Sequence, residues 1–258
     1  MKVVILAGGF GTRISEYTDD IPKPLITVNG KPILVHIMEH YASYGFKEFI
    51  IALGYKGDKI KNYFLNYSSV QSDLEIDKSG KIKILSNKKL NWKIKLIDTG
   101  LNTFTGGRIK RLEKYLDKER FFLTYGDGLS NVNLNKLLNF HKRKKKLITV
   151  TAVRPTARFG ELEINHNNDL VKSFKEKPQM HQGWINGGFF VIEPGFLKFI
   201  KSDKSILERD PMTIAANKKK LSAFKHRGFW QCMDSKRDKE TLEKLSKMKK
   251  IPWKKIKK

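Results

Sequence analysis

The segment GGFGTR, residues 8–13, has the composition of a loop that holds phosphate. Its glycines let the backbone approach an anion closely, and consecutive amide groups can form an anion-binding nest. Arg13 adds a planar, permanently charged guanidinium that suits phosphate oxygens. The loop lacks the lysine of a P-loop and the third glycine of the dinucleotide fingerprint. The pattern indicates another kind of phosphate site, although a tight turn with a surface arginine explains the same residues.

Lys23 is the second candidate, because it lies between Pro22 and Pro24. The two prolines restrict the local backbone. A lysine on such a stiff segment, a short loop beyond the glycines, could return to the same phosphates. The alternative is an ordinary exposed lysine, of which this chain has many.

Two aspartates are candidates for binding a metal. Asp127 stands between two glycines in TYGDG, residues 124–128, and Asp234 lies in GFWQCMDS, residues 228–235. Mg²⁺ is often bound by one or two carboxylates together with substrate phosphates. A turn aspartate and a helix N-cap are the respective alternatives. Taken with the glycine loop and Lys23, the pair predicts Mg²⁺-assisted chemistry on a polyphosphate.

A further polar region follows later in the chain. Glu176 and Lys177 come after a predicted strand, and Asn186 opens the next one. Sugar hydroxyls need paired donors and acceptors, and a sugar phosphate also needs a cation. These side chains supply both, but other polar ligands require the same groups, and Glu-Lys-Pro is common in surface turns.

The elements that position these residues follow an α/β rhythm. Residues 2–8 form a continuous apolar run typical of a buried strand, and 32–45 carry apolar residues at helical spacing up to a terminal glycine. A second buried strand is predicted at 47–55 and a helix at 56–67. Strand and helix alternating in this way predict a parallel sheet with right-handed crossovers.

The rest of the chain is less regular, and we expect one domain over residues 1–258. Further strands are expected at 93–100, 119–128, 147–153, 159–164, 170–177 and 184–194, and helices at 106–116, 133–145 and 239–250.

The net charge of +26 is the most unusual property of the composition. It favours anionic substrates by long-range attraction. Clusters such as KRKKK, residues 142–146, are mostly lysine with few aromatic residues between them, so we interpret them as solvated surface and expect no specific nucleic-acid partner. Cys232 is the single cysteine, and no apolar run is long enough for a membrane span, so we expect a cytoplasmic protein without membrane contact.

Several motifs occur in order along nearly the whole chain, and through them it resembles the sugar-phosphate nucleotidylyltransferases. They include LAGGFGTR (6–13), PKPL (22–25), TYGDG (124–128) and INGGFFVIEP (185–194). The resemblance implies an α/β fold of the Rossmann-like nucleotidyltransferase type, with a mixed, mostly parallel sheet flanked by helices. The segment LIDTGLNTFTGGRIKRL (96–112) is similar to the cytidylyl branch, which uses CTP, α-D-glucose 1-phosphate and Mg²⁺ to give CDP-glucose and pyrophosphate.

The same resemblance assigns roles to individual residues. Arg13 would hold the β- and γ-phosphates, Lys23 would steady the α-phosphate or the incoming sugar phosphate, and Asp127 would complete the catalytic set. It implies nucleotide binding by Leu6, Gly8, Gly9, Gly11, Thr12, Arg13, Lys23, Arg108 and Arg111, sugar-phosphate binding by Gly160, Glu176, Lys177 and Asn186, and metal binding by Asp127 and Asp234.

The resemblance also implies a homo-oligomer. Thr156 and Ala157 stand where the family pattern has Pro-Gly, and this departure affects a loop near the expected sugar. UTP or dTTP as donor, or another sugar 1-phosphate, therefore remains an alternative. A catalytically inactive, basic nucleic-acid-binding relative is the alternative from another class.

Overall fold

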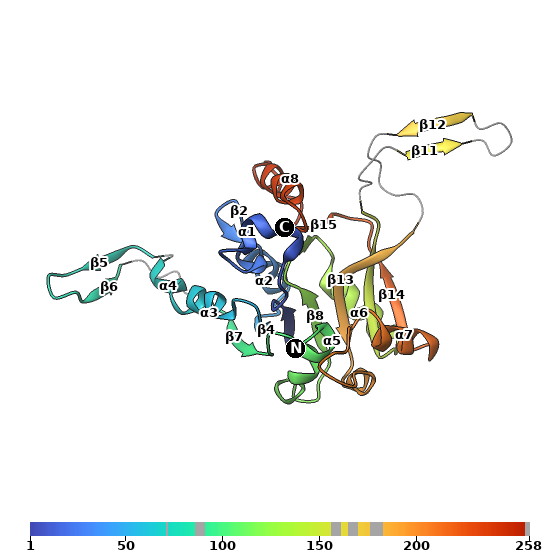
Figure 1. Cartoon of the computed structure of the whole chain (residues 1–258), viewed down its shortest axis with the longest axis horizontal. Coiled ribbons are helices and arrows are strands. Elements are labelled where there is room, and N and C mark those ends of the chain that lie inside the picture. The colour runs from blue at the N-terminus through green and yellow to red at the C-terminus, as the bar shows by residue number, and fades with distance from the viewer. Residues whose placement is uncertain (71, 86–90, 156–160, 165–169, 176–182, 256–258) are drawn as a thin grey trace.

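The computed structural model describes residues 1–70, 72–85, 91–155, 161–164, 170–175 and 183–255. Within them a seven-stranded sheet forms the centre of the molecule, in the order β14-β10-β13-β8-β1-β4-β7 (Figure 1). Strand β13 runs antiparallel to both of its neighbours, and the remaining pairs are parallel. The predicted mixed, mostly parallel sheet is therefore confirmed. Its strands are β1 (Val3–Leu6), β4 (Glu48–Leu53), β7 (Lys93–Asp98), β8 (Phe121–Tyr125), β10 (Ile148–Val153), β13 (Ile185–Ile192) and β14 (Leu221–Lys225).

The sheet is covered on both faces, which explains the continuous apolar run of β1. Successive side chains of a strand point to opposite faces. Val3 and Ile5 enter one hydrophobic core, whereas Val4 and Leu6 enter the other. A strand buried on both sides needs apolar residues at every position, so period-2 alternation is lost.

Helices form the two outer layers. The helices pack on the sheet through buried side chains. Leu34, Leu137 and Leu242 belong to the first hydrophobic core. Ile109, Phe196 and Ala215 belong to the second. The first layer contains α2 (Ile33–Ala42), α3 (Gly57–Leu65), α6 (Leu134–Lys144) and α8 (Lys236–Ser246), and the second contains α5 (Thr105–Arg111), α7 (Asp210–Asn217) and the 3-10 segment η4 (Pro194–Phe199).

Some boundaries differ from the sequence prediction. The helix expected at 106–116 ends at Arg111, and a 3-10 turn, Glu113–Tyr115, replaces its last turn. The strand expected at 119–128 is confined to Phe121–Tyr125, because Gly126 and Asp127 turn the chain away from the sheet. Helix α7 and strand β14 had no strong periodic signal and were not predicted.

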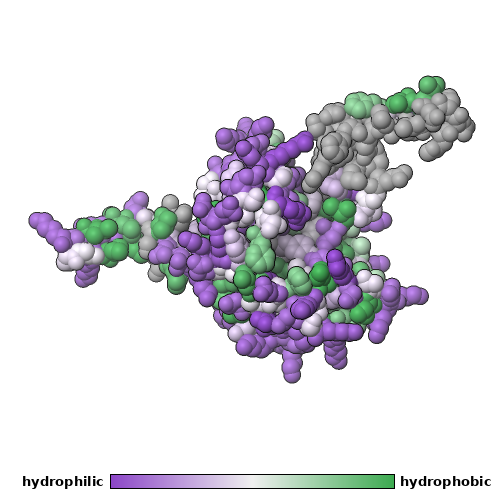
Figure 2. Space-filling model, viewed as in Figure 1, coloured by the Kyte–Doolittle hydropathy of each residue, from purple (hydrophilic) through white to green (hydrophobic). Residues whose placement is uncertain are grey.

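Short elements complete the fold. They are α1 (Ser15–Thr18), α4 (Tyr67–Val70) and the strand pairs β2–β3 (Thr27–Val28, Lys31–Pro32), β5–β6 (Leu74–Ile76, Ile82–Ile84), β9–β15 (Gly128–Ser130, Trp230–Cys232) and β11–β12 (Glu161–Ile164, Val171–Lys175). The β5–β6 hairpin extends away from the body (Figure 1). Hydrophobic side chains gather on it, while hydrophilic ones dominate the visible face of the body (Figure 2). Among the described helices, none combines the length and apolar character needed to cross a membrane.

Candidate active site

A cavity of about 1380 Å³ opens at one edge of the central sheet. Leu6 and Tyr125 end the parallel strands β1 and β8, and Asn186 lies near the start of the antiparallel strand β13. All three therefore reach the same edge, which is where open α/β sheets bind ligands. Most of the predicted site residues line this cavity, namely Leu6, Gly8, Gly9, Gly11, Thr12, Arg13, Lys23, Arg108, Asp127, Asn186 and Asp234.

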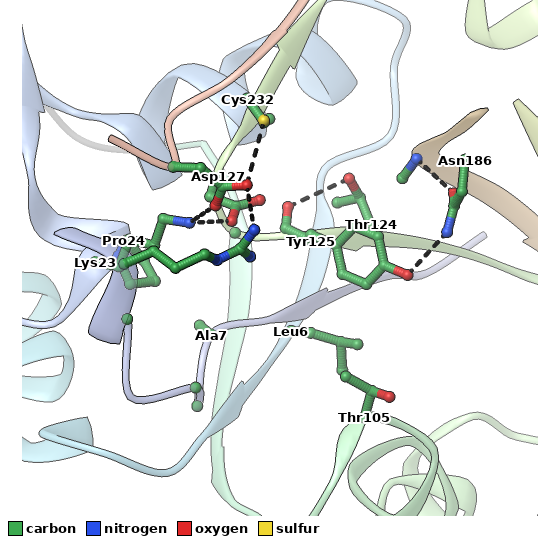
Figure 3. A pocket seen from close by; sticks show the side chains of 18 of the residues that line it. Leu6, Ala7, Lys23, Pro24, Thr105, Thr124, Tyr125, Asp127, Asn186 and Cys232 are labelled. Carbon is green, nitrogen blue, oxygen red and sulfur yellow. Dashed lines mark hydrogen bonds and ion pairs between the residues drawn. The ribbon is translucent and has the colours of Figure 1, made fainter. Parts of the chain in front are cut away.

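A cluster of ion pairs lines the cavity. The Lys23 ammonium lies 2.6 Å from an Asp127 carboxylate oxygen (Figure 3) and 2.5 Å from one of Asp234. The other Asp234 oxygen contacts the Arg13 guanidinium at 2.8 Å. The sequence predicted that these four residues act together, and the structure brings them together from segments far apart in the chain.

Local structure explains the convergence of the two aspartates. Strands β9 and β15 pair antiparallel, with Gly128 opposite Cys232, and the Met233 amide donates to the Asp127 carbonyl at 2.9 Å. Each aspartate therefore leaves this ladder at the same end. Ser235, directly after Asp234, is the N-cap of α8 in a capping box, so the helix start fixes the second carboxylate.

Burial and charge oppose each other at Lys23. Only 8% of the residue is exposed, and this burial alone would lower its pKa, but the charges of Asp127 and Asp234 and their hydrogen bonds outweigh burial and raise the pKa above 10.5. Burial similarly favours protonation of Asp234, yet the Lys23 ammonium, aided by Arg13, lowers the pKa of that carboxyl below 3.8. Lys23 and Asp234 are both charged at neutral pH.

The Cys232 thiol lies beside this cluster, 3.6 Å from an Asp234 oxygen. Burial, followed by the two aspartate charges, raises the pKa of the thiol to about 12. The thiol is therefore protonated at neutral pH and is a poor nucleophile. This agrees with a reaction in which the substrate supplies the attacking atom.

The glycine loop presents its backbone to the cavity. In the described part of the chain, no hydrogen bond engages the amides of Gly9, Phe10 and Gly11. Gly11 has φ of +70°, and a Cβ there would lie 2.8 Å from Cγ2 of Thr18. The position therefore favours glycine on both conformational and steric grounds. Free amides beside a guanidinium form a site for a phosphate group.

Arg108 braces this loop from behind. Its guanidinium is buried and lies 2.8–3.1 Å from five oxygens, those of the carbonyls of Gly8, Leu53, Gly100 and Leu101 and the hydroxyl of Thr99. Cavity-lining Arg108 therefore holds the start of the glycine loop. Arg111, predicted from the same segment, is not brought to the cavity, because its guanidinium pairs with Asp203 at the protein surface.

Another part of the cavity lining carries hydrogen-bonding side chains that lie outside the ion-pair cluster. Asn186 is there, as predicted, and it contacts Tyr125, for which the sequence predicts no role. The position of Tyr125 at a strand end, just before Gly126-Asp127, was an available signal. Glu208 and Thr105 also line the cavity, and although Thr105 lies in the 96–112 motif, the sequence predicts a site role for neither residue. Gly160, Glu176 and Lys177 lie outside the described residues.

Asp127 and Asp234 fit a divalent cation by their chemistry. Their oxygens already converge on one cation, the Lys23 ammonium, and carboxylates are the usual protein ligands of Mg²⁺. No cluster of three or more His, Cys, Asp or Glu side chains suited to a metal occurs among the described residues. A metal held here would therefore complete its coordination with substrate oxygens or water.

The sheet edge, the free amides and the clustered charges define a class of α/β proteins that bind and transfer phosphate-containing groups. A sequence model described as Nucleotidyl transferase matches residues 2–235, and the chain belongs to this family. The glucose-1-phosphate cytidylyltransferase of Salmonella typhimurium is 45% identical over 256 residues, which cover 98% of this chain and 99% of the relative. The probable glucose-1-phosphate cytidylyltransferase of Bacillus subtilis is 42% identical with the same coverage.

A solved structure supports the fold. HddC from Yersinia pseudotuberculosis, complexed with GMP-PN, superimposes with a TM-score of 0.70 at 26% identity. The match covers 95% of this chain and 99% of HddC.

Proposed function

We propose that this protein transfers the cytidylyl group of CTP to α-D-glucose 1-phosphate, giving CDP-glucose and pyrophosphate for nucleotide-sugar synthesis. The observation that carries the chemistry is the cluster of Lys23, Asp127 and Asp234 beside the glycine loop in one cavity. The choice of CTP and glucose 1-phosphate is supported by the two relatives of that name, which align over almost the whole chain.

The reaction needs alignment and charge neutralisation more than acid–base chemistry. A phosphate oxygen of glucose 1-phosphate attacks the α-phosphorus of CTP, a new P–O bond forms, and the bond to the β-phosphate oxygen breaks. The electron pair of that bond leaves with pyrophosphate. Holding the two substrates in line supplies much of the rate enhancement in such transfers. No protein nucleophile is required.

The charged residues share this work. The free amides of the glycine loop and Arg13 bind the β- and γ-phosphates and stabilise the leaving pyrophosphate. Lys23 neutralises charge at the α-phosphate or on the attacking sugar phosphate. Its ammonium donates to two carboxylates here and has a third N–H, which can donate to a phosphate oxygen.

Asp127 and Asp234 are the residues that would hold Mg²⁺. When bound, the metal supplies positive charge to phosphate oxygens as negative charge develops on the leaving group. The two carboxylates orient Lys23 in the structure described here, and that pairing keeps all three side chains fixed before substrates arrive.

The proposed sugar-phosphate site consists of Asn186 and three residues that lie outside the described part of the structure. Asn186 binds sugar hydroxyls, Lys177 binds the sugar phosphate, and Gly160 and Glu176 contact the sugar. Arg108 contributes to CTP binding by supporting the glycine loop.

Self-assembly is also part of the proposal, with a second copy of this chain as the partner. Ile76, Ile82 and Ile84 of the projecting hairpin are 65%, 58% and 47% exposed, and burying such side chains is favourable. Sedimentation of the protein, and of a variant with these three residues changed to serine, would test it.

A substrate panel tests the proposal. The protein is incubated with Mg²⁺, each of CTP, UTP, dTTP and GTP, and each of several sugar 1-phosphates, and products are identified by mass spectrometry. CTP with glucose 1-phosphate should give the fastest product formation. An equal or higher rate with UTP or dTTP would contradict the choice of nucleotide, and a faster sugar would contradict the choice of acceptor.

A further inference from the structure

Three cavity side chains that the phosphate chemistry does not use form a hydrogen-bonded chain. Asn186 Nδ2 lies 3.1 Å from the Tyr125 hydroxyl (Figure 3), and this hydroxyl contacts the Glu208 carboxylate. The residues come from β13, from the end of β8 and from the loop before α7. These hydrogen bonds therefore join three separate segments at the cavity wall.

The direction of these hydrogen bonds is fixed by chemistry. An ionised carboxylate only accepts, so the single hydroxyl hydrogen of Tyr125 is donated to Glu208. The hydroxyl oxygen can then only accept from its other neighbour, and Asn186 must turn its amide NH₂ group toward it. The Asn186 Oδ1 in turn accepts from the Gly188 amide at 2.8 Å. The Gly188 amide and the Tyr125–Glu208 pair therefore select the same orientation of the Asn186 amide.

The Tyr125 ring is held in one place. Gly188 has φ of +76°, and a Cβ at this position would lie 2.6 Å from Cδ2 of Tyr125. The ring thus packs directly against a glycine backbone, and Phe190 meets it edge to face at 5.9 Å.

Glu208 is exposed but anchored at both oxygens. Its Oε1 accepts from Tyr125, and its Oε2 accepts from the Thr105 hydroxyl at 2.8 Å. Thr105 also accepts from the Leu207 amide at 2.9 Å, so it fixes the backbone beside Glu208 as well. Thr105 begins α5, the helix that carries Arg108 to the glycine loop.

We propose that Tyr125 and Glu208 are positioning residues for the sugar 1-phosphate. Together with the Gly188 amide, they hold the Asn186 amide so that its remaining N–H and its remaining lone pair are offered to sugar hydroxyls. This inference rests on the proposed function, because it assigns the Asn186 side of the cavity to the sugar. Neither residue is assigned a contact with the reacting phosphorus, so they control affinity for the sugar phosphate and not affinity for CTP.

Four variants test the proposal by steady-state kinetics. Tyr125→Phe and Glu208→Ala should each raise KM for glucose 1-phosphate about fivefold to tenfold, the usual effect of one lost hydrogen bond. KM for CTP and kcat should stay within about twofold. Glu208→Gln keeps an acceptor for the tyrosine hydroxyl and should restore a KM near that of the wild type. Tyr115→Phe, outside the cavity, is the matched control and should change nothing.

Two kinetic results would contradict the positioning role of Tyr125. An unchanged KM for glucose 1-phosphate in Tyr125→Phe, or an equal rise in both KM values, would overturn the positioning role. Thermal melting of each variant identifies any that fails to fold. Tyr125→Phe removes one oxygen and is expected to fold, so the test does not depend on Glu208→Ala.

A binding measurement separates this inference from the proposed function. Calorimetric titration with CDP-glucose and with CTP needs no turnover. Tyr125→Phe should weaken CDP-glucose binding about fivefold to tenfold and leave CTP binding unchanged. If Tyr125→Phe shows this weaker CDP-glucose binding but the wild type has no activity, the proposed reaction is refuted and the positioning role is not. An active wild type with unaltered CDP-glucose binding in the variant would refute the inference alone.

Discussion

The two sides of the cavity are built on different physical principles. On the phosphate side, Lys23, Asp127 and Asp234 form ion pairs of 2.5–2.6 Å. On the proposed sugar side, the neutral groups of Tyr125 and Asn186 form directed hydrogen bonds that end on one carboxylate. Fixed charges can stabilise charge that develops during a reaction, whereas neutral hydrogen bonds chiefly discriminate between ligands. We therefore expect changes on the first side to reduce turnover and changes on the second to reduce affinity.

The largest effect is expected at the carboxylate pair. Asp127→Asn should lower kcat by about 1000-fold or more, since it removes one of the two carboxylates that would hold Mg²⁺ against the phosphates. Pyrophosphate release with CTP and glucose 1-phosphate measures it. Asp203→Asn, a carboxylate outside the cavity, is the control and should retain kcat within about twofold. If Asp127→Asn kept a tenth of the activity, the charged side would not be the catalytic one.

Replacing Lys23, the cation between Asp127 and Asp234, should change turnover and metal binding in opposite directions. Lys23→Met should lower kcat by about 100-fold, the lower end of losses seen when a charge-stabilising group is removed. It should also strengthen Mn²⁺ binding without nucleotide, because Asp127 and Asp234 would no longer share an ammonium. Electron paramagnetic resonance titration with Mn²⁺ measures this, with Lys110→Met as the surface control. Weaker Mn²⁺ binding in Lys23→Met would show that the carboxylates do not form a shared cation site.

Arg108 and Arg111, which come from the same segment, should contribute differently to the free energy of unfolding. Arg108→Ala should destabilise the fold by about 2–4 kcal/mol, since it removes the five hydrogen bonds of a buried guanidinium. Arg111→Ala should cost less than about 1 kcal/mol, because its partner Asp203 is exposed. Urea unfolding of both variants measures the difference. Equal losses would mean that the five contacts of Arg108 do not brace the glycine loop.

The smallest expected effect is on the pH dependence of stability. Because the folded pKa of Asp234 is below 3.8, the stability from its ion pairs is complete above that pH and is lost as pH falls through the folded value. Because the folded pKa of Lys23 is above 10.5, the stability from its pairs is complete below 10.5 and is lost as pH rises through the folded value. The Tm difference between wild type and Asp234→Asn should therefore be constant from about pH 5 to 9, at a few degrees, and narrow outside that range. A difference that changes by half between pH 6 and 8 would contradict these shifts.

The phosphate side could largely be predicted from the sequence because its residues are tied to local signals. A buried apolar strand followed by glycines placed the loop, and Gly126 and Gly128 marked Asp127 as a turn residue at a strand end. Strands β1 and β8 are parallel neighbours, so their ends had to meet at one edge of the sheet. What local signals did not show is that Lys23 pairs with both aspartates, a contact that depends on the β9–β15 ladder.

The sugar side was harder to predict because it depends on long-range contacts between unremarkable residues. Glu208 reaches Tyr125 across 83 positions of sequence and Thr105 across 103. No periodicity marks such a partner. The two arginines show the same limit, since one segment supplied both and only the packing of α5 decides that Arg108 turns inward while Arg111 faces Asp203.

The most direct test of the central claim is pyrophosphate release from CTP and glucose 1-phosphate, measured side by side for the wild type and Asp127→Asn in the presence of Mg²⁺. We expect one pyrophosphate per CDP-glucose formed by the wild type and almost none from the variant. Pyrophosphate without CDP-glucose, no product from the wild type, or equal rates for the two proteins would contradict it.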